Sequence, residues 1–170
     1  MDTPWQNTSS LAQVQLIARS LKLWTGRDLL AGATPAAEPA APGSPADARS
    51  SSAAYADRIF HAPFVLVSHG TETDPVLNYG NQAALTLWEM SWDELTRTPS
   101  RLTAETPHLD ERARLLAAVT THGFIDDYSG IRVSRTGRRF RILRATVWNL
   151  LDNRRDYAGQ AALFSRWDFL

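Results

Sequence analysis

The segment that most constrains the fold is residues 61–90, which read HAPFVLVSHGTETDPVLNYGNQAALTLWEM. Residues 64–67 are apolar and include two valines, a composition that favours a buried strand. Gly70 and an Asp-Pro pair then break the chain, and residues 76–79 predict a second short strand. Asn81 suits the N-cap of a helix whose apolar residues recur three positions apart. This order predicts a β-hairpin that leads directly into a short helix.

The second half of the chain predicts one longer helix and three more strands. The helix is expected over residues 110–121, and the strands over residues 124–133, 140–150 and 160–164. Alternation is imperfect within the middle strand, and a bulge or burial of both faces near Ile142 would explain it. Two strands, several helices and then three strands predict an α+β domain, with helices on one face of a five-stranded antiparallel sheet.

The N-terminal third predicts a tethered helix. Residues 10–25 place their apolar side chains on one stripe, and Ser10 with Gln13 resembles a capping box. Residues 31–48 contain eight alanines and four prolines, which predict a flexible linker. A short leading helix is expected over residues 52–60. The stripe would either pair with a second copy of the chain or pack on its own sheet, and the sequence leaves both open.

We therefore expect three parts along the chain. Residues 1–30 would hold the amphipathic helix, residues 31–50 the Pro/Ala-rich linker, and residues 51–170 the folded domain. We expect no output domain on this chain, so any signal from this domain would pass to a separate protein or through dimerisation.

The composition excludes several kinds of site. The chain has no cysteine, so structural disulfides, thiolate metal sites and thiol nucleophiles are excluded. The formal net charge is zero, so the molecule as a whole exerts no long-range attraction on nucleic acid or an anionic membrane. No apolar run approaches the ~20 residues needed to span a bilayer, and the polar N-terminus lacks the pattern of a secretory signal. We expect a cytoplasmic protein without a membrane segment.

One segment is strongly basic. Residues 131–155 carry eight arginines and one acid, a composition that can bind phosphate. Apart from Phe140, however, the stacking aromatics of a nucleic-acid binder are missing there. We therefore expect a solvated sheet face that pairs with the acidic residues of the domain, and no nucleic-acid partner.

The residues that could support catalysis are few. His69 follows the first strand, and as a proton shuttle it would need a partner such as Asp126 or Asp127. These two neighbours point to opposite faces of a strand, so they cannot act together as an acid/base couple. No phosphate-binding glycine loop, zinc-protease helix or serine elbow occurs. We therefore predict a protein that is not an enzyme, with no catalytic or metal-binding residues, and keep a small enzyme using His69 as the alternative.

The residues of this domain also resemble the MEKHLA-domain family, a PAS-like group with bacterial stand-alone members. The resemblance covers roughly residues 52–165. Within the opening segment it rests on Ala62-Pro63-Phe64, Val67-Ser68-His69, Asp74-Pro75-Val76, Asn78-Tyr79 and Asn81-x-Ala83-Ala84-Leu85. Further along it rests on Trp88-Glu89, the run from Pro99 to Ala104, the run from Gly123 to Tyr128, Gly137-Arg138-Arg139-Phe140 and Trp148-Asn149.

The resemblance implies a sensory or regulatory module of the PAS type. Such a domain would bind a small molecule or a regulatory protein between its helices and the concave face of its sheet, and a homodimer is one expected assembly. The ligand-binding residues expected on this basis are His69, Tyr79, Asn81, Trp88, Tyr128 and Trp148. Each also has a structural interpretation: His69 as a turn residue, Asn81 as a helix cap, and the aromatic residues as core.

The resemblance does not identify a cofactor. Light-sensing PAS relatives bond a flavin to a cysteine, and this chain has none. Haem-binding PAS domains use a histidine on the long helix, where only His108 and His122 stand near its ends. Haem and non-covalent flavin are therefore not expected, and the ligand stays unknown.

Overall fold

The structure, a computed structural model, describes residues 3–31, 45–105 and 109–170. Its elements follow one another as η1 (Pro4–Gln6), α1 (Thr8–Thr25), α2 (Pro45–Phe60), β1 (Val65–His69), β2 (Leu77–Gly80), α3 (Gln82–Trp88), α4 (Trp92–Leu95), η2 (Ser100–Thr103), α5 (Leu109–His122), β3 (Phe124–Val133), β4 (Arg139–Leu151), β5 (Tyr157–Phe164) and β6 (Arg166–Phe169). The predicted hairpin, the helix capped by Asn81 and the three later strands are confirmed. His108, one of the two histidines considered as a haem ligand, lies outside the described residues.

The strands form one antiparallel sheet in the order β2-β1-β5-β4-β3. β1 lies between β2 and β5, with Val67 opposite Gly80 on one side and Ala162 on the other. The first half of β4 pairs with β6 and its second half pairs with β5. The α+β class and the antiparallel sheet are therefore confirmed. The sixth strand, β6, was not predicted, because it is four residues long and pairs with a distant part of the chain.

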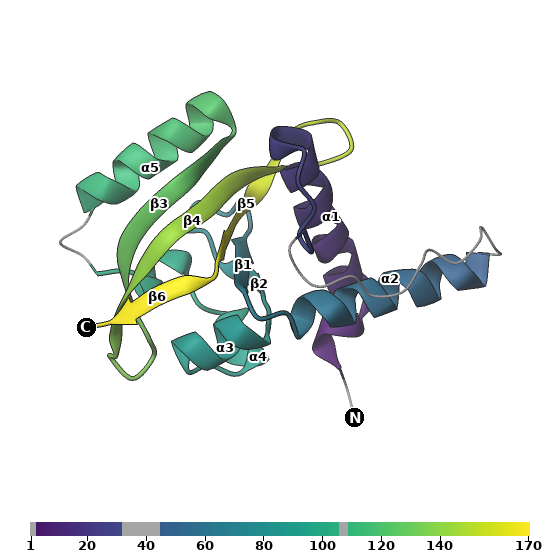
Figure 1. The fold of residues 1–170 in the computed structure, drawn as a ribbon, viewed down its shortest axis with the longest axis horizontal. Coiled ribbons are helices and arrows are strands. Elements are labelled where there is room, and N and C mark those ends of the chain that lie inside the picture. Colours follow the sequence, from purple (N-terminus) through teal and green to yellow (C-terminus); the bar gives the residue numbers. More distant parts are fainter. Residues whose placement is uncertain (1–2, 32–44, 106–108) are drawn as a thin grey trace.

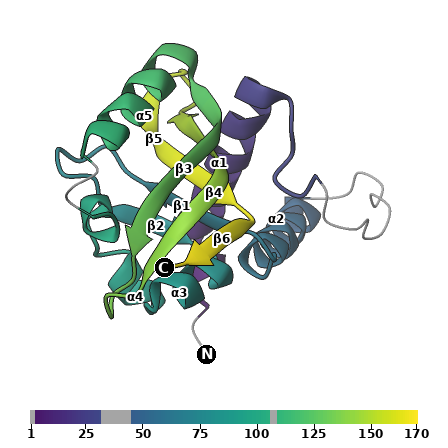
Figure 2. The same ribbon diagram turned by 60° about the vertical axis from the view of Figure 1, so that its left-hand side comes forward.

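Helices cover both faces of this sheet, whereas the sequence predicted them on one face. Figures 1 and 2 show α5 against β3 on one side and α1 crossing β4 on the other. We call the face covered by α3 and α5 the inner face and the face covered by α1 the outer face. The residues of β1 show why two layers are needed: Val65 belongs to the inner apolar cluster, and its neighbour Leu66 belongs to the outer one. Both side chains are fully buried.

A bulge in β4 gives this strand its irregular pattern. Tyr128 of β3 lies opposite Ala145, but Gly130 lies opposite Ile142, so two steps along β3 meet three along β4. Arg144 sits within the extra length and has a left-handed backbone with φ 54°. As a result Ile142 and Ala145 both reach the inner cluster. Regular alternation would place Ile142 and Ala145 on opposite faces. The bulge that the sequence analysis offered as one explanation of the irregular pattern is present in the structure.

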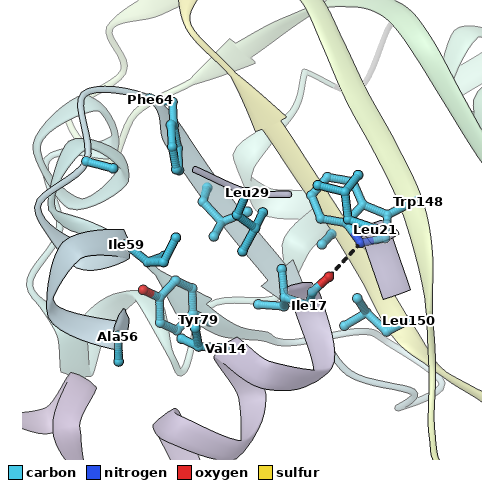
Figure 3. Close-up of a cluster of buried hydrophobic side chains, with 13 residues drawn as sticks. Val14, Ile17, Leu21, Leu29, Ala56, Ile59, Phe64, Tyr79, Trp148 and Leu150 are labelled. Carbon is cyan, nitrogen blue, oxygen red and sulfur yellow. Dashed lines mark hydrogen bonds between the residues drawn. The ribbon is translucent and has the colours of Figure 1, made fainter. Parts of the chain in front are cut away.

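Helix α1 begins earlier than predicted and packs on the sheet of its own chain. Its N-cap is Asn7, whose Oδ1 accepts a hydrogen bond from the Ser10 amide at 2.8 Å, so the predicted capping box at Ser10 is wrong. Ser10 is instead buried and donates to the carbonyl of Pro4 at 2.6 Å. Apolar residues of α1, among them Ile17, fill the outer cluster beside Trp148, as Figure 3 shows.

Hydrogen bonds fix α1 on the outer face. The indole Nε1 of Trp148 donates to the Ile17 carbonyl at 3.2 Å, the bond drawn in Figure 3. The indole Nε1 of Trp24, in the last turn of α1, donates to the Asn149 carbonyl at 2.9 Å. The amide of Leu151 donates to the Ser20 hydroxyl at 2.9 Å. Each bond joins α1 to β4, so the helix and this strand are held in a fixed register.

Helix α2 begins at Pro45 rather than at the expected residue 52, because proline is tolerated in the first turn of a helix. Of the expected linker, residues 32–44 lie outside the described residues, and the division into three parts stays a prediction. The far end of α2 is joined to the N-terminus by the rings of Trp5 and Phe60, which stack with centroids 3.8 Å apart. Within the described ranges, no helix is long and apolar enough to cross a bilayer.

Candidate functional site

A cavity of about 100 Å³ lies on the inner face, between the sheet and the helical segments α3, η2 and α5. Its walls are mostly apolar, with Val67, Leu77, Trp88, Leu115, Ile142, Ala145, Val147 and Phe164 among them. A smaller set of polar side chains is interspersed: Ser68, His69, Ser100, Thr103, Tyr128, Arg132 and Gln160. An apolar pocket with a few converging polar groups is the usual form of a small-molecule site.

Three of the six predicted ligand-binding residues line this cavity. His69 ends β1, and its Nδ1 donates a hydrogen bond to the Gly70 carbonyl at 2.9 Å. This bond fixes the orientation of the ring, which also has other contacts. Trp88, at the end of α3, stands edge-on to Phe140 with ring centroids 5.3 Å apart. Tyr128 of β3 is the third. Whether these residues bind a ligand remains a prediction.

Trp88 has one unusual feature. The residue is 3 % exposed, and its indole Nε1 has no hydrogen-bond partner. Most buried donors in proteins are paired, and an unpaired one costs roughly 1–3 kcal/mol. This nitrogen is itself buried, so Trp88 lines the cavity without exposing its donor to the cavity space.

Asn81 does not line the cavity, because all of its hydrogen-bonding capacity serves the fold. Its Oδ1 accepts from the amides of Leu66 at 3.1 Å and Ala84 at 3.2 Å. Its Nδ2 donates to the carbonyls of Phe64 at 2.8 Å and Ile59 at 3.3 Å. The structural interpretation, a helix cap, accounts for the residue, which also ties α2 and β1 to α3.

Tyr79 and Trp148 face the opposite side of the sheet. Both are fully buried in the outer cluster with α1, as Figure 3 shows. The ring of Tyr79 stands edge-on to Trp92 at 5.6 Å, and burial raises the pKa of its phenol well above the ordinary value. Neither residue is among those that line the cavity, since the period of two along a strand directs them outward.

The His–Asp pair of the enzymatic alternative does not converge. Oδ1 of Asp126 accepts from Thr146 at 2.7 Å and from Arg27, just beyond α1, at 2.8 Å. Partial burial opposes ionisation of Asp126, but these hydrogen bonds outweigh it and hold the pKa of the carboxyl below its ordinary value. Asp127 is exposed, and neither carboxylate lines the cavity that contains His69.

Metal and haem sites find little support among the residues that the structure describes. No group of three or more His, Asp or Glu side chains there is placed to hold a metal ion. His122 is exposed at the end of α5.

Arg132, Thr103 and Gln160 line the cavity but were not predicted. Arg132 was counted within the basic segment as part of a solvated face. The only signal for its inward position is its place in β3, four residues after Tyr128 in the same strand. Residues an even number of positions apart in a strand lie on the same face, so Tyr128 and Arg132 share one face of β3. Only the register of the sheet shows which face that is.

The chain matches the model of the family described as MEKHLA domain over residues 11–169. This match begins within α1, so it includes the N-terminal helix that was expected to lie outside the domain. Comparison with curated proteins gives no match.

Several solved structures have a similar fold at low sequence identity. The PAS domain of a protein from Colwellia psychrerythraea matches with a TM-score of 0.57 and 11% identity, over 69% of this chain and 94% of that one. A light-oxygen-voltage domain studied with a flavin analogue matches with a TM-score of 0.53 and 13% identity, over 69% and 84%. An RNA-binding light-oxygen-voltage receptor matches with a TM-score of 0.58 and 13% identity, over 77% and 36%. The likeness establishes a PAS-like fold.

A flavin does not fit the residues present. An apolar cavity of about 150 Å³ holds one benzene ring, whereas the cavity here measures about 100 Å³ and a flavin has three fused rings. The chain also has no cysteine to bond one.

Proposed function

Because the chain belongs to the MEKHLA-domain family and has a PAS-like fold, we propose that it is a sensory or regulatory module that binds a small molecule in the cavity on the inner face of its sheet. The observation that carries this proposal is the cavity itself, which is apolar, about 100 Å³ in volume and supplied with a few polar groups. Its walls come from β1, β3, β4, β5, α3 and α5, so a ligand would contact most of the domain at once.

The position of α1 suggests how binding would be transmitted. Val147 of β4 lines the cavity, and the next residue, Trp148, donates its indole hydrogen bond to α1 on the outer face. A ligand that favours one position of β4 would therefore bias the docking of α1, provided that it binds the two states with different affinity.

The proposed output is a change in what the outer face or α1 can bind. The partner would be a regulatory protein or a second copy of the chain, which would give a homodimer. We further propose a cytoplasmic location and a role without catalysis, since His69 and Asp126 belong to different sites of the sheet.

Native mass spectrometry of freshly purified full-length protein tests ligand binding and counts subunits in one measurement. We expect a bound small molecule that is lost in Ala145→Leu, because the larger side chain fills the cavity. Ala158→Leu adds the same volume beside the outer cluster and is expected to retain the ligand. Circular dichroism would verify that both variants fold. If no small molecule is bound and no compound of a metabolite panel shifts the melting temperature, the proposal fails.

A further inference from the structure

The polar groups of the cavity point to the chemical class of its ligand, an inference that rests on the proposed binding function. Among the described residues that line the cavity there is no Asp or Glu, while one arginine, Arg132, lines it. The polar groups other than Arg132 are uncharged side chains and His69. The cavity wall that the structure describes is therefore selective for a neutral or negatively charged ligand.

Arg132 is held in place by neutral groups. Its Nη2 donates to the Tyr128 hydroxyl at 3.0 Å, and its Nη1 donates to the Ile131 carbonyl at 3.0 Å. Its guanidinium carbon lies 5.4 Å from the centroid of the Tyr128 ring. These contacts use two of five N–H donors and leave the positive charge without an opposite charge in the described part of the chain.

Two neighbouring arginines of the same hairpin differ from Arg132 because each has a carboxylate partner. Arg135 pairs with Glu94 at 3.0 Å, and Arg139 pairs with Glu105. Both of these arginines also lie outside the set that lines the cavity. Arg132 is thus an oriented and half-buried cation in the wall of a pocket, which is the usual arrangement for binding a carboxylate.

Trp88 contributes a large side chain to the cavity wall. Its indole N–H is buried away from the cavity space and has no partner among the described residues. Most of the remaining wall is apolar and includes Ala145, Val147 and Phe164. A volume of about 100 Å³ restricts the apolar part of a ligand to less than a benzene ring, which needs about 150 Å³.

We propose that the cavity binds a short-chain carboxylate, whose negative group pairs with the guanidinium of Arg132 while its small apolar chain fills the space between β4 and α3. Arg132 is accordingly a binding residue, and the apolar wall, which includes Trp88, sets the length of the chain that is accepted.

Butyrate and butyramide form a matched pair of probes, since they share a carbon chain and differ in charge. Isothermal titration of the full-length protein at neutral pH is expected to show butyrate binding at least about tenfold more tightly than butyramide, because a hydrogen bond to a charged group is worth about 1.5–3 kcal/mol. Arg132→Met, which keeps most of the volume and removes the charge, should abolish this preference. Arg141→Met removes an exposed charge from the neighbouring strand and should preserve it.

Equal binding of butyramide and butyrate, or an unchanged preference in Arg132→Met, would overturn the ligand class. So would a native mass spectrum that shows a bound molecule without an acidic group. In those cases the proposed binding function stands. Failure of every probe, together with a spectrum free of small molecules, would instead overturn the binding function itself.

Discussion

Asn81 connects three elements through one buried side chain. It is fully buried and makes four hydrogen bonds, to backbone groups of Ile59, Phe64, Leu66 and Ala84. In Asn81→Ala these groups lose their partner without access to water, so we expect a loss of about 3 kcal/mol in the free energy of unfolding. Urea unfolding monitored by circular dichroism measures it.

Asn7→Ala is the matched control for Asn81→Ala. Asn7 is also an asparagine N-cap, but it is exposed and accepts one hydrogen bond, from Ser10. Its removal should cost about 1 kcal/mol. Equal losses in the two variants would show that Asn81 acts as a helix cap and nothing more.

The same residue shows how far single positions can be predicted from the sequence. The pattern around Asn81 indicates a helix cap, because capping depends on residues a few positions away. Its bonds to Ile59 and Phe64 depend on where α2 and β1 meet, which no local pattern encodes. The aromatic residues pose a related problem. The alternation along a strand predicts that Val147 and Trp148 face opposite sides, but not that the cavity lies on the side of Val147.

At the scale of elements, α1 and β4 meet where Gly123 leaves no room for a side chain. Gly123 has φ 80°, and a Cβ added there would lie 2.4 Å from the ring of Trp24. Gly123→Ala must therefore strain the backbone and also displace Trp24, which anchors the end of α1 by its hydrogen bond to Asn149. We expect a loss of about 3 kcal/mol in unfolding free energy and a change in tryptophan fluorescence.

Gly26→Ala separates the two effects of that substitution. Gly26 ends α1 with φ 74°, but a Cβ there would meet no atom within 4 Å. The substitution carries the backbone cost alone, about 1–2 kcal/mol. If Gly123→Ala costs no more than Gly26→Ala and leaves the fluorescence unchanged, the contact between Trp24 and Gly123 does not stabilise the docking of α1.

Elements with strong local patterns were predictable, and those defined by distant contacts were not. The apolar stripe predicted α1 and its amphipathic character, but packing on its own sheet depends on Trp148 and Leu150, more than a hundred residues later. β6 was missed for the same reason, since its partner is the first half of β4. The expectation of helices on one face was incomplete. Leu66 and Trp148 make the outer face of the sheet apolar, so this face also needs a helix packed against it.

At the scale of the whole molecule, β4 contributes to both apolar clusters and is also the strand to which α1 is hydrogen-bonded, and the proposed signal depends on it. Val147→Ala removes two methyl groups from the cavity wall one residue before Trp148. If β4 couples the two faces, amide hydrogen exchange should show that the opening free energy of α1 falls by about 1 kcal/mol more than that of β2, at the far edge of the sheet.

Leu87→Ala is the control for that measurement, because Leu87 fills the same inner cluster from α3 and not from the sheet. It should lower the stability of the molecule without a selective effect on α1. If the opening free energy of α1 falls more than that of β2 in both variants, α1 responds to any substitution that weakens the inner cluster. If the opening free energies of α1 and β2 fall equally in both variants, the two faces of the sheet are independent. A ligand in the cavity would then have to signal through the inner helices α3 and α5. Only a loss confined to Val147→Ala makes β4 the route from the cavity to α1, because Val147, unlike Leu87, belongs both to the cavity wall and to the strand that α1 is bonded to.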